Sequence, residues 1–593
     1  MPRRPRGGLA PLWRYTAGRR RRIAFVMLLA AISAAAPVAS WSIVGDAVDN
    51  GIRARDEHRL TLDVLAYLGV GAGAWVLGTT TWILLAGLGQ RIVLELRRDL
   101  FEHLTSLSLR YFSEQKAGWI IARLTSDVDA LSDVLNQGLM TLVVNTLTLG
   151  AAIGGLFLLD WRLGLVALLV LPPGIVVTRW FQRTSHVAFA DVRTRIAVVT
   201  AQLAESVSGM AVIQAFNRES EFKAEFAGLN EENRVANVYA QKLSSVFFPA
   251  IELLGVAATV FVLFAGSRLI DSGELQLGTL IAAVGMIQLI FQPLQELSEL
   301  YGQVQSASAA MDKISTVLDA EQDLTDRPGA EALPRIEGRL ELDDVVFAYG
   351  EEPVVRGISI DVPVGGCVAL VGESGGGKST TAKLIARFYD PAKGAVRVDG
   401  IDLRSVQLRS YRRQLGVVLQ DPFLFSGTIA DNIRFARPDA TDAEVAEAAR
   451  AIGVDRVAAR FPDDLQHVVR EGGAGLSAGE RQLISIARAL LADPRILILD
   501  EATSNIDRPA ERAIEAAFDT LLRGRTSIII AHRLTTVRRA DEILLVEHGK
   551  IVQRGTYATL LAEEGPFRRL ATTMHGVLAQ SGGKPGAVGR REP

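Results

Sequence analysis

The sequence predicts a membrane α-helical bundle of six transmembrane helices with long cytoplasmic extensions, followed by a C-terminal α/β P-loop nucleotide-binding domain. Three observations lead to this fold class. Long uncharged runs fill the first half of the chain, short strands alternate with helices from Gly338 onward, and residues 372–379 fit the pattern G-x-x-x-x-G-K-[ST]. The composition agrees, because 49% hydrophobic residues are too many for an ordinary soluble enzyme and 22% charged residues are too many for a wholly membrane-embedded chain.

A chain of 593 residues is expected to contain more than one domain. We predict a basic cytoplasmic segment at 1–22, a transmembrane domain with intracellular coupling loops at 23–318, a linker at 319–337, the nucleotide-binding domain at 338–575 and a disordered tail at 576–593. The formal net charge of −2 gives no reason to expect a nucleic-acid partner. The single cysteine, Cys367, excludes an internal disulfide and a cysteine-based metal site.

The first uncharged run, Ile23–Gly45, follows a cluster of arginines and is long enough to cross a bilayer. We expect a transmembrane helix whose N-terminus is cytoplasmic. A signal peptide is the alternative, although only the alanines at 34–36 resemble a cleavage site. Five further apolar runs, uncharged except for Glu252 in the fourth of them, would complete six spans: Val64–Gln90, Asn136–Leu159, Leu163–Thr178, Leu243–Ser267 and Leu275–Gln295.

Six spans would leave both ends of this region in the cytoplasm. The third and fourth runs are separated only by residues 160–162, which predicts a tight hairpin on the side of the membrane opposite the cytoplasm. The long polar segments 91–135 and 181–242 fall on the cytoplasmic side and have helical apolar spacing. We expect them to continue the membrane helices into the cytosol and to contact a cytosolic domain there.

Polar side chains inside the predicted spans are candidates for a substrate path. Gln288 and Gln292 lie on one stripe of the sixth run, which favours a water-filled cavity. Glu252 is the acidic residue well inside the fifth run. For Glu252, a translocation path and helix–helix hydrogen bonding both remain open.

The phosphate-binding pattern has the expected context, since the apolar run 367–371 predicts a strand before it and residues 380–388 predict a helix after it. The glycines let successive backbone N–H groups point at phosphate oxygens, and the helix dipole adds positive potential. Lys378 should reach the β- and γ-phosphates, and the Ser379 hydroxyl should bind Mg²⁺. The predicted ATP-binding residues here are Gly372, Glu373, Ser374, Gly375, Gly376, Gly377, Lys378, Ser379 and Thr380.

Further residues match the chemistry of ATP hydrolysis. The apolar run 496–499 predicts a buried strand that ends at Asp500, a Mg²⁺-holding carboxylate, and Glu501, which would polarise the attacking water. His532 follows another predicted strand, where it could contact the γ-phosphate. Tyr349 ends the predicted strand 339–349 and could stack on adenine.

The run Leu476, Ser477, Ala478, Gly479 and Glu480 looks like an LSGGQ signature. With it, the chain resembles the exporter-type ABC transporters, which are half-transporters with six membrane helices and one nucleotide-binding domain. The resemblance implies a Q-loop at Gln420, which would bind Mg²⁺ together with Ser379 and Asp500, and a D-loop that includes Asp507. It also implies the aromatic A-loop position for Tyr349 and the H-loop position for His532.

The resemblance implies that ATP and Mg²⁺ bind between two nucleotide-binding domains. The signature of one domain would cover the γ-phosphate held by the P-loop of its partner, using the Ser477 hydroxyl and the Gly479 N–H. ATP binding would then join the two domains, hydrolysis would weaken the joint, and the membrane cavity would face the two sides of the membrane in turn.

The signature departs from the family pattern, since Ala478 adds a methyl group and Glu480 replaces a neutral amide with a negative charge. Because a signature serves the partner's nucleotide, any weakness would fall on the opposite site. Intact motifs for this chain's own ATP site together with a departing signature resemble the active-site-bearing subunit of heterodimeric exporters. This resemblance slightly favours a heterodimer with a second, different half-transporter over a homodimer. Asn505 in the D-loop also departs from the pattern.

The function expected from these features is export of hydrophobic or amphipathic small molecules or lipids, driven by ATP hydrolysis. An importer of lipids or siderophores with the same fold is an alternative, and an ATP-gated channel or regulator is another. The expected location is the plasma (inner) membrane, with the N-terminus and the ATPase domain in the cytoplasm. Arginine-, alanine- and glycine-rich usage suggests a bacterial source.

Overall fold

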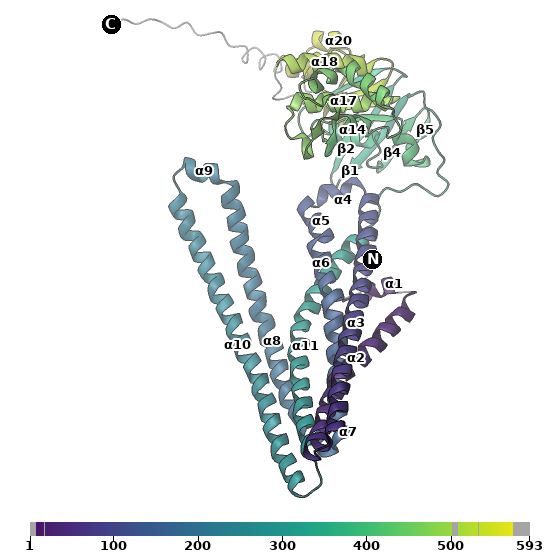
Figure 1. Ribbon diagram of the computed structural model, residues 1–593. Coiled ribbons are helices and arrows are strands. Elements are labelled where there is room, and N and C mark those ends of the chain that lie inside the picture. The colour runs from purple at the N-terminus through teal and green to yellow at the C-terminus, as the bar shows by residue number, and fades with distance from the viewer. Residues whose placement is uncertain (1–7, 17, 501–507, 532, 573–593) are drawn as a thin grey trace. The chain divides into compact units, whose positions relative to one another are not determined.

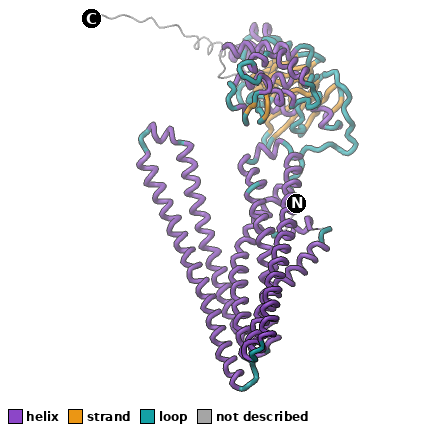
Figure 2. The backbone as a smooth tube through the Cα atoms, viewed as in Figure 1, coloured by secondary structure: helices purple, strands orange, loops and turns teal. Residues whose placement is uncertain are grey.

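The computed structural model describes residues 8–16, 18–500, 508–531 and 533–572. The chain forms two compact units. The first contains the chain up to Ser106 and Gln115–Ala320, and the second contains Leu107–Glu114 and the chain from Glu321 onward. The first unit is helical, whereas the second combines helices and strands (Figure 2). Each unit is described separately below.

Six long helices dominate the described part of the first unit (Figure 1). They are α2 (Arg20–Asp46), α3 (Glu57–Ser106), α7 (Leu139–Leu159), α8 (Trp161–Ser208), α10 (Glu219–Asp271) and α11 (Leu277–Leu318). Shorter elements connect or precede them: η1 (Ala10–Leu12), α1 (Trp13–Thr16), η2 (Ala47–Arg53), α5 (Ala117–Leu124), α6 (Ser126–Asp133), η3 (Val134–Gly138) and α9 (Met210–Ala215). The structure therefore has the predicted helical bundle with long extensions.

By length and composition, five stretches of helix in the described part of the chain could cross a membrane. They are Arg20–Arg53, Glu57–Ser106, Ala117–Leu159, Glu219–Asp271 and Leu277–Leu318. The fourth predicted span, Leu163–Thr178 in α8, is not among them. Its uncharged run ends at Arg179 and is shorter than the ~20 residues that a membrane helix needs.

Side chains from several helices form the core of the first unit. The buried Phe181 of α8 stacks on Phe247 of α10, with ring centroids 4.0 Å apart. Met286 of α11 belongs to the same apolar cluster. Helices α8 and α10 pack along one another and are joined at one end by α9 (Figure 1). At the loop end of α11, a Cβ on Gly278 would lie 2.0 Å from the carbonyl oxygen of Gly45, so this crossing requires glycine.

The second unit contains a six-stranded sheet in the order β12-β11-β3-β10-β9-β6, in which only β12 is antiparallel. A second, antiparallel sheet has the order β2-β1-β4-β5, and β7 pairs with β8. The strands are β1 (Leu340–Ala348), β2 (Pro353–Val362), β3 (Cys367–Val371), β4 (Lys393–Val398), β5 (Ile401–Asp402), β6 (Leu415–Val418), β7 (Gly427–Thr428), β8 (Val468–Val469), β9 (Ile496–Asp500), β10 (Thr526–Ile530), β11 (Glu542–Glu547) and β12 (Lys550–Gly555).

Helices cover the six-stranded sheet, as the α/β pattern requires. The described helices of the second unit include α12 (Lys378–Ile385), α13 (Leu408–Arg412), α14 (Ile429–Arg434), α15 (Asp442–Ile452), α16 (Val454–Ala458), α17 (Ala478–Leu491), α18 (Arg508–Leu522), α19 (Leu534–Val537) and α20 (Tyr557–Ala562). Of these, α14, α15 and α16 pack on α17. The short α4 (Leu109–Glu114) and the turns η4 (Leu403–Ser405), η5 (Asp464–Gln466) and η6 (Glu471–Gly473) also belong to this unit.

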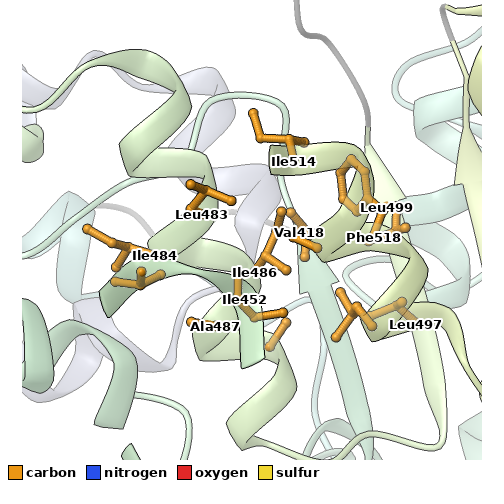
Figure 3. Close-up of a cluster of buried hydrophobic side chains, with 14 of the residues drawn as sticks. Val418, Ile452, Leu483, Ile484, Ile486, Ala487, Leu497, Leu499, Ile514 and Phe518 are labelled. Atoms are coloured by element: carbon orange, nitrogen blue, oxygen red, sulfur yellow. The ribbon is translucent and has the colours of Figure 1, made fainter. Parts of the chain in front are cut away.

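Strand β9 is buried on both faces, which explains its unbroken apolar sequence. Leu497 and Leu499 pack into the cluster that includes Ile486 and Phe518 (Figure 3). The alternate residues, Ile496 and Ile498, pack into the cluster on the opposite face.

The segment predicted as a linker packs on the second unit over most of its length. Leu333 and Ile336 are buried in the same core cluster as β1. The backbone N–H of Ile336 donates to Oε1 of Gln414 at 2.9 Å, and the N–H of Leu408 donates to Oδ1 of Asp326 at 2.7 Å. These contacts tie residues 326–336 to the helical region around α13.

Candidate functional site

The parallel strands of the second unit end at one edge of the sheet and gather the predicted nucleotide-binding residues there. Leu370 of β3 pairs with Ile530 of β10, and Ile530 pairs with Asp500 of β9. On the other side of β9, Val418 of β6 pairs with Leu499. The phosphate-binding loop after β3, Asp500, and Gln420, two residues beyond β6, therefore lie at the carboxyl edge where open α/β sheets bind ligands.

The phosphate-binding loop depends on glycine at two positions. Gly372 has φ 138°, and a Cβ there would lie 2.2 Å from the carbonyl oxygen of Val546. Gly377 has φ 103° and is the N-cap of α12, where its carbonyl accepts the N–H of Thr381 at 2.9 Å. Both residues need backbone freedom that a side chain would remove. The loop therefore delivers the N-terminus of α12 to the sheet edge, where it can bind anions.

The Lys378 side chain lies across the loop. Its Nζ donates to the carbonyl oxygens of Gly372 and Glu373, at 2.8 and 2.7 Å. Burial lowers the pKa of this amine, and the Asp500 carboxylate opposes that shift. The amine is thus a positioned cation beside a carboxylate, which is the arrangement that phosphate and Mg²⁺ binding requires.

Tyr349 lies next to α12. Its hydroxyl is 3.3 Å from Oγ1 of Thr380, and its ring packs edge-on against Phe347 and Tyr389, with centroids 5.0 and 5.3 Å apart. The residue is 37% exposed, so part of its surface is free to meet a planar ligand.

Oxygen donors suited to Mg²⁺ lie at the same edge. The exposed Ser379 lies in the first turn of α12, Asp500 ends β9, and the exposed Gln420 follows β6. A hydroxyl, a carboxylate and an amide oxygen are ligands that Mg²⁺ accepts, and the ion would neutralise phosphate charge when bound. These residues fit the ion.

Three predicted site residues, Glu501, Asp507 and His532, lie outside the described residues, as does Asn505.

The signature residues lie at the N-terminus of α17, which begins at Ala478. Ser477 is the N-cap: its Oγ accepts the Glu480 N–H at 3.3 Å, while the Glu480 carboxylate accepts the Ser477 N–H at 2.9 Å. This is a reciprocal capping box. The other oxygen of the Glu480 carboxylate is 2.5 Å from a guanidinium nitrogen of Arg460. The negative charge expected at the signature is therefore paired within the unit. Ala478 is exposed, whereas Leu476 and Gly479 are buried.

The predicted substrate-path residues are exposed but do not line the described cavities. Glu252 lies on α10, and Gln288 and Gln292 lie on α11. A cavity of about 880 Å³ is instead lined by residues of α6, α8, α10 and α11, among them Glu299. A neighbouring cavity of about 450 Å³ is lined by Arg179, Gln182, Arg183, His186, Tyr301 and Gln305.

Sequence reasoning missed two polar groups of the first unit. Glu296 of α11 accepts hydrogen bonds from the buried Asn145 at 2.8 Å and from Gln292 at 3.0 Å. It directly follows the last predicted span, so it was not counted as part of the membrane helix. Arg179 directly follows the fourth predicted span and Arg183 lies in the polar segment 181–242. Their i, i+4 spacing is the signal that would have placed them on one helix face.

Two family models match the chain. One is described as the ABC transporter transmembrane region and matches residues 23–294, and the other is described as ABC transporter and matches residues 355–504.

Individual relatives cover most of the chain. It is 38% identical to a fatty acid ABC transporter ATP-binding/permease protein of Mycobacterium bovis, over 87% of this chain and 81% of the relative. It is 36% identical to an ATP-dependent lipid A-core flippase of Syntrophus aciditrophicus, over 82% and 81%. Among solved structures, a bacterial Atm1-family ABC exporter with ATP bound matches with a TM-score of 0.79 and 28% identity, covering 94% of this chain and 98% of that one.

Proposed function

This chain belongs to the exporter-type ABC transporters, and from that premise we propose that it exports amphipathic molecules with an acidic head group, such as fatty acids or anionic lipids. It is a half-transporter that carries one membrane domain and one ATPase domain, and ATP hydrolysis drives its transport cycle. The observation that carries the choice of cargo is the pair of arginines at the smaller membrane-unit cavity.

The depth of these arginines supports an acidic head group. Helix α8 begins at Trp161, so Arg179 and Arg183 lie about 27 and 33 Å along it at ~1.5 Å per residue. The six-span topology predicts that α8 crosses the membrane from Trp161. On that premise the distance is close to the ~30 Å thickness of the hydrocarbon core, so both guanidiniums would lie at the inner head-group level. Among the described residues, no carboxylate forms an ion pair with either one.

The surroundings of the pair support an amphipathic rather than a small hydrophilic anion. Tyr301 and Gln305 of α11 line the same cavity and offer neutral polar groups. The apolar faces of α8 and α11 continue from there towards the outer membrane surface. A carboxylate or phosphate at the arginines would therefore leave its hydrocarbon chain along apolar helix surface. The names of the two relatives, a fatty acid transporter and a lipid A-core flippase, agree with this class of cargo.

The test uses the full chain in liposomes and measures stimulation of ATP hydrolysis by an added fatty acid. The double variant Arg179→Ala/Arg183→Ala should lose most of that stimulation, whereas Arg234→Ala, an exposed arginine of α10 paired with Glu231, should not. A cationic amphiphile of equal chain length serves as the control ligand. Equal stimulation by both amphiphiles, or an unaffected double variant, would contradict an anionic cargo.

We further propose that the half-transporter works as a dimer closed by nucleotide. Exposed apolar side chains on α8 and α9, well beyond the bilayer, support this: Val198, Leu203, Val207 and Val212. Val198 lies about 56 Å along α8, past the ~45 Å of a complete bilayer, so lipid cannot cover it. A second protein chain would bury these side chains.

The partner is either a different half-transporter or a second copy of this chain. The departures at Ala478 and Glu480 favour a different partner. The ion pair between Glu480 and Arg460 favours a second copy, because a neutralised Glu480 leaves this chain's signature able to meet a nucleotide. Mass photometry of the chain expressed alone, with the hydrolysis-blocking variant Glu501→Gln, ATP and Mg²⁺, distinguishes the two. A dimer means that the chain pairs with itself, and a persistent monomer means that it needs another partner.

The proposed orientation is an inner-membrane protein with a cytoplasmic ATPase domain and outward transport. Inside-out vesicles supplied with external ATP should accumulate the fatty acid in their lumen. Loss from the lumen of preloaded vesicles would instead indicate an importer, and ATP-gated flux down a gradient without net accumulation would indicate a channel. Transport that survives Glu501→Gln would refute ATP-driven export.

A further inference from the structure

We propose that Arg460 is a positioning residue of the signature, which holds the Glu480 carboxylate back against its own helix and neutralises it, so that the variant signature still accepts the partner's ATP. This inference rests on the proposed nucleotide-closed dimer. It concerns the part of the composite site that this chain contributes, and it applies whether the partner is a second copy or a different half-transporter.

The geometry uses both oxygens of the Glu480 carboxylate. Oε2 accepts the N–H of Ser477 at 2.9 Å, and Oε1 is 2.5 Å from a guanidinium nitrogen of Arg460. The Glu480 side chain is only 15% exposed, whereas that of Arg460 is 54% exposed. The arginine therefore reaches in from the surface to cover a carboxylate that already faces its own helix terminus.

Arg460 is placed for this contact by the loop that follows α16. Its Nε is 3.5 Å from the carbonyl oxygen of Val457, and its guanidinium lies 5.5 Å from the ring centroid of Phe461. Phe461 stacks on His467, with centroids 3.7 Å apart. These contacts limit the directions in which the arginine can extend.

The capping box leaves the Ser477 hydroxyl able to act on phosphate. Its oxygen accepts the Glu480 N–H, and a hydroxyl has one donor as well as two acceptor positions. The hydroxyl proton therefore remains available for an acceptor in front of the helix, beside the N–H of Gly479. An anion at this helix terminus would be met by donors only if the Glu480 charge stays turned away.

The pair explains how an acidic residue is tolerated at this position. A glutamine can form the same capping box without any charge. A glutamate adds a full negative charge within one residue of Gly479, where it would repel a triphosphate. Arg460 restores the local charge to zero, which is the value that glutamine would give. Arg460 and Glu480 are therefore a compensating pair: the arginine neutralises the charge that the glutamate brings to the signature.

The test compares the full-length chain in liposomes as four proteins: the unchanged chain, Arg460→Ala, Glu480→Gln and the double variant. An unpaired charge near the nucleotide costs on the order of 1 kcal/mol in a solvated interface, so Arg460→Ala should raise KM for ATP about five- to tenfold. We expect kcat to change less than twofold, because the ATP-contacting residues are untouched. The double variant should recover most of the lost affinity.

Two controls separate charge neutralisation from folding. Arg456→Ala removes an exposed arginine of α16, four residues before Arg460, and should leave KM unchanged. The KM increase in Arg460→Ala should shrink as salt rises from 50 to 300 mM, since screening weakens a repulsive charge and would not repair a misfolded loop.

The outcomes are distinct. If the unchanged chain hydrolyses ATP and Arg460→Ala matches Arg456→Ala, the positioning role is wrong while the proposed function stands. If Arg460→Ala raises KM but the double variant does not recover, Arg460 acts by another route and the compensating pair is refuted. If the unchanged chain shows no ATP hydrolysis alone or with a partner half-transporter, the proposed function itself has failed.

Discussion

Replacing Tyr349 tests whether the adenine ring stacks on the aromatic side chain beside α12. A base–aromatic stack contributes about 1–3 kcal/mol, so Tyr349→Ala should weaken ATP binding about 5- to 150-fold. Tyr349→Phe keeps the ring and its edge contacts with Phe347 and Tyr389, and loses only the 3.3 Å contact to Thr380. We therefore expect Phe to retain nearly all of the affinity, and Trp to equal or exceed it.

The assay is equilibrium binding of a fluorescent ATP analogue to the full chain in detergent, with magnesium present. Triphosphate without a base provides the control, because its weaker binding should not depend on residue 349. The stacking argument would be refuted if Tyr349→Ala bound ATP as tightly as the unchanged chain, or if Phe lost as much affinity as Ala. Equal losses for ATP and for the base-free triphosphate would show that the variant had disturbed the phosphate loop instead.

Three further predictions follow from the structure. Gly372→Ala would place a Cβ 2.2 Å from the Val546 carbonyl oxygen, so ATP binding should be abolished while circular dichroism stays unchanged. Gly375→Ala is strained by its φ of 84°, but its Cβ would meet no atom within 4 Å, so it should lose less ATP binding. Burial raises the pKa of the Cys367 thiol to about 12, so at pH 9 it stays protonated, and iodoacetamide should label the folded chain ~10²-fold more slowly than the unfolded chain. Asn145→Leu should lower the melting temperature in detergent by leaving Glu296 with one fewer donor, a cost of ~1–3 kcal/mol, and adding Glu296→Met should recover much of it; no recovery would contradict the pairing.

The parts of the fold that depend on local pattern could be predicted from the sequence. The strand Cys367–Val371 matches β3, because a five-residue apolar run before a glycine loop leaves little choice of structure. The predicted strand 496–499 is likewise β9, extended by Asp500. The overall fold class is confirmed by the family models and by the related exporter structure.

Features that depend on contacts between distant segments could not be predicted in this way. Nothing in the spacing of Arg460 and Glu480, which are twenty residues apart with η5, β8 and η6 between them, indicates an ion pair. The effect of Glu480 was therefore expected from its own charge alone. Glu296 was missed for a related reason, since its hydrogen-bond donor Asn145 lies on another helix.

The docking of residues 326–336 on the ATPase unit has a practical consequence for anyone who wishes to study that unit in isolation. A fragment that begins at Gly338, where the strand pattern starts, would lack Leu333 and Ile336, which are buried in its hydrophobic core. Burying each aliphatic side chain stabilises the fold by about 1.5–3 kcal/mol, which is a large share of a domain's free energy of unfolding. A soluble fragment that begins near Glu321 keeps both buried side chains. It should resist aggregation and melt at a higher temperature than the fragment that begins at Gly338.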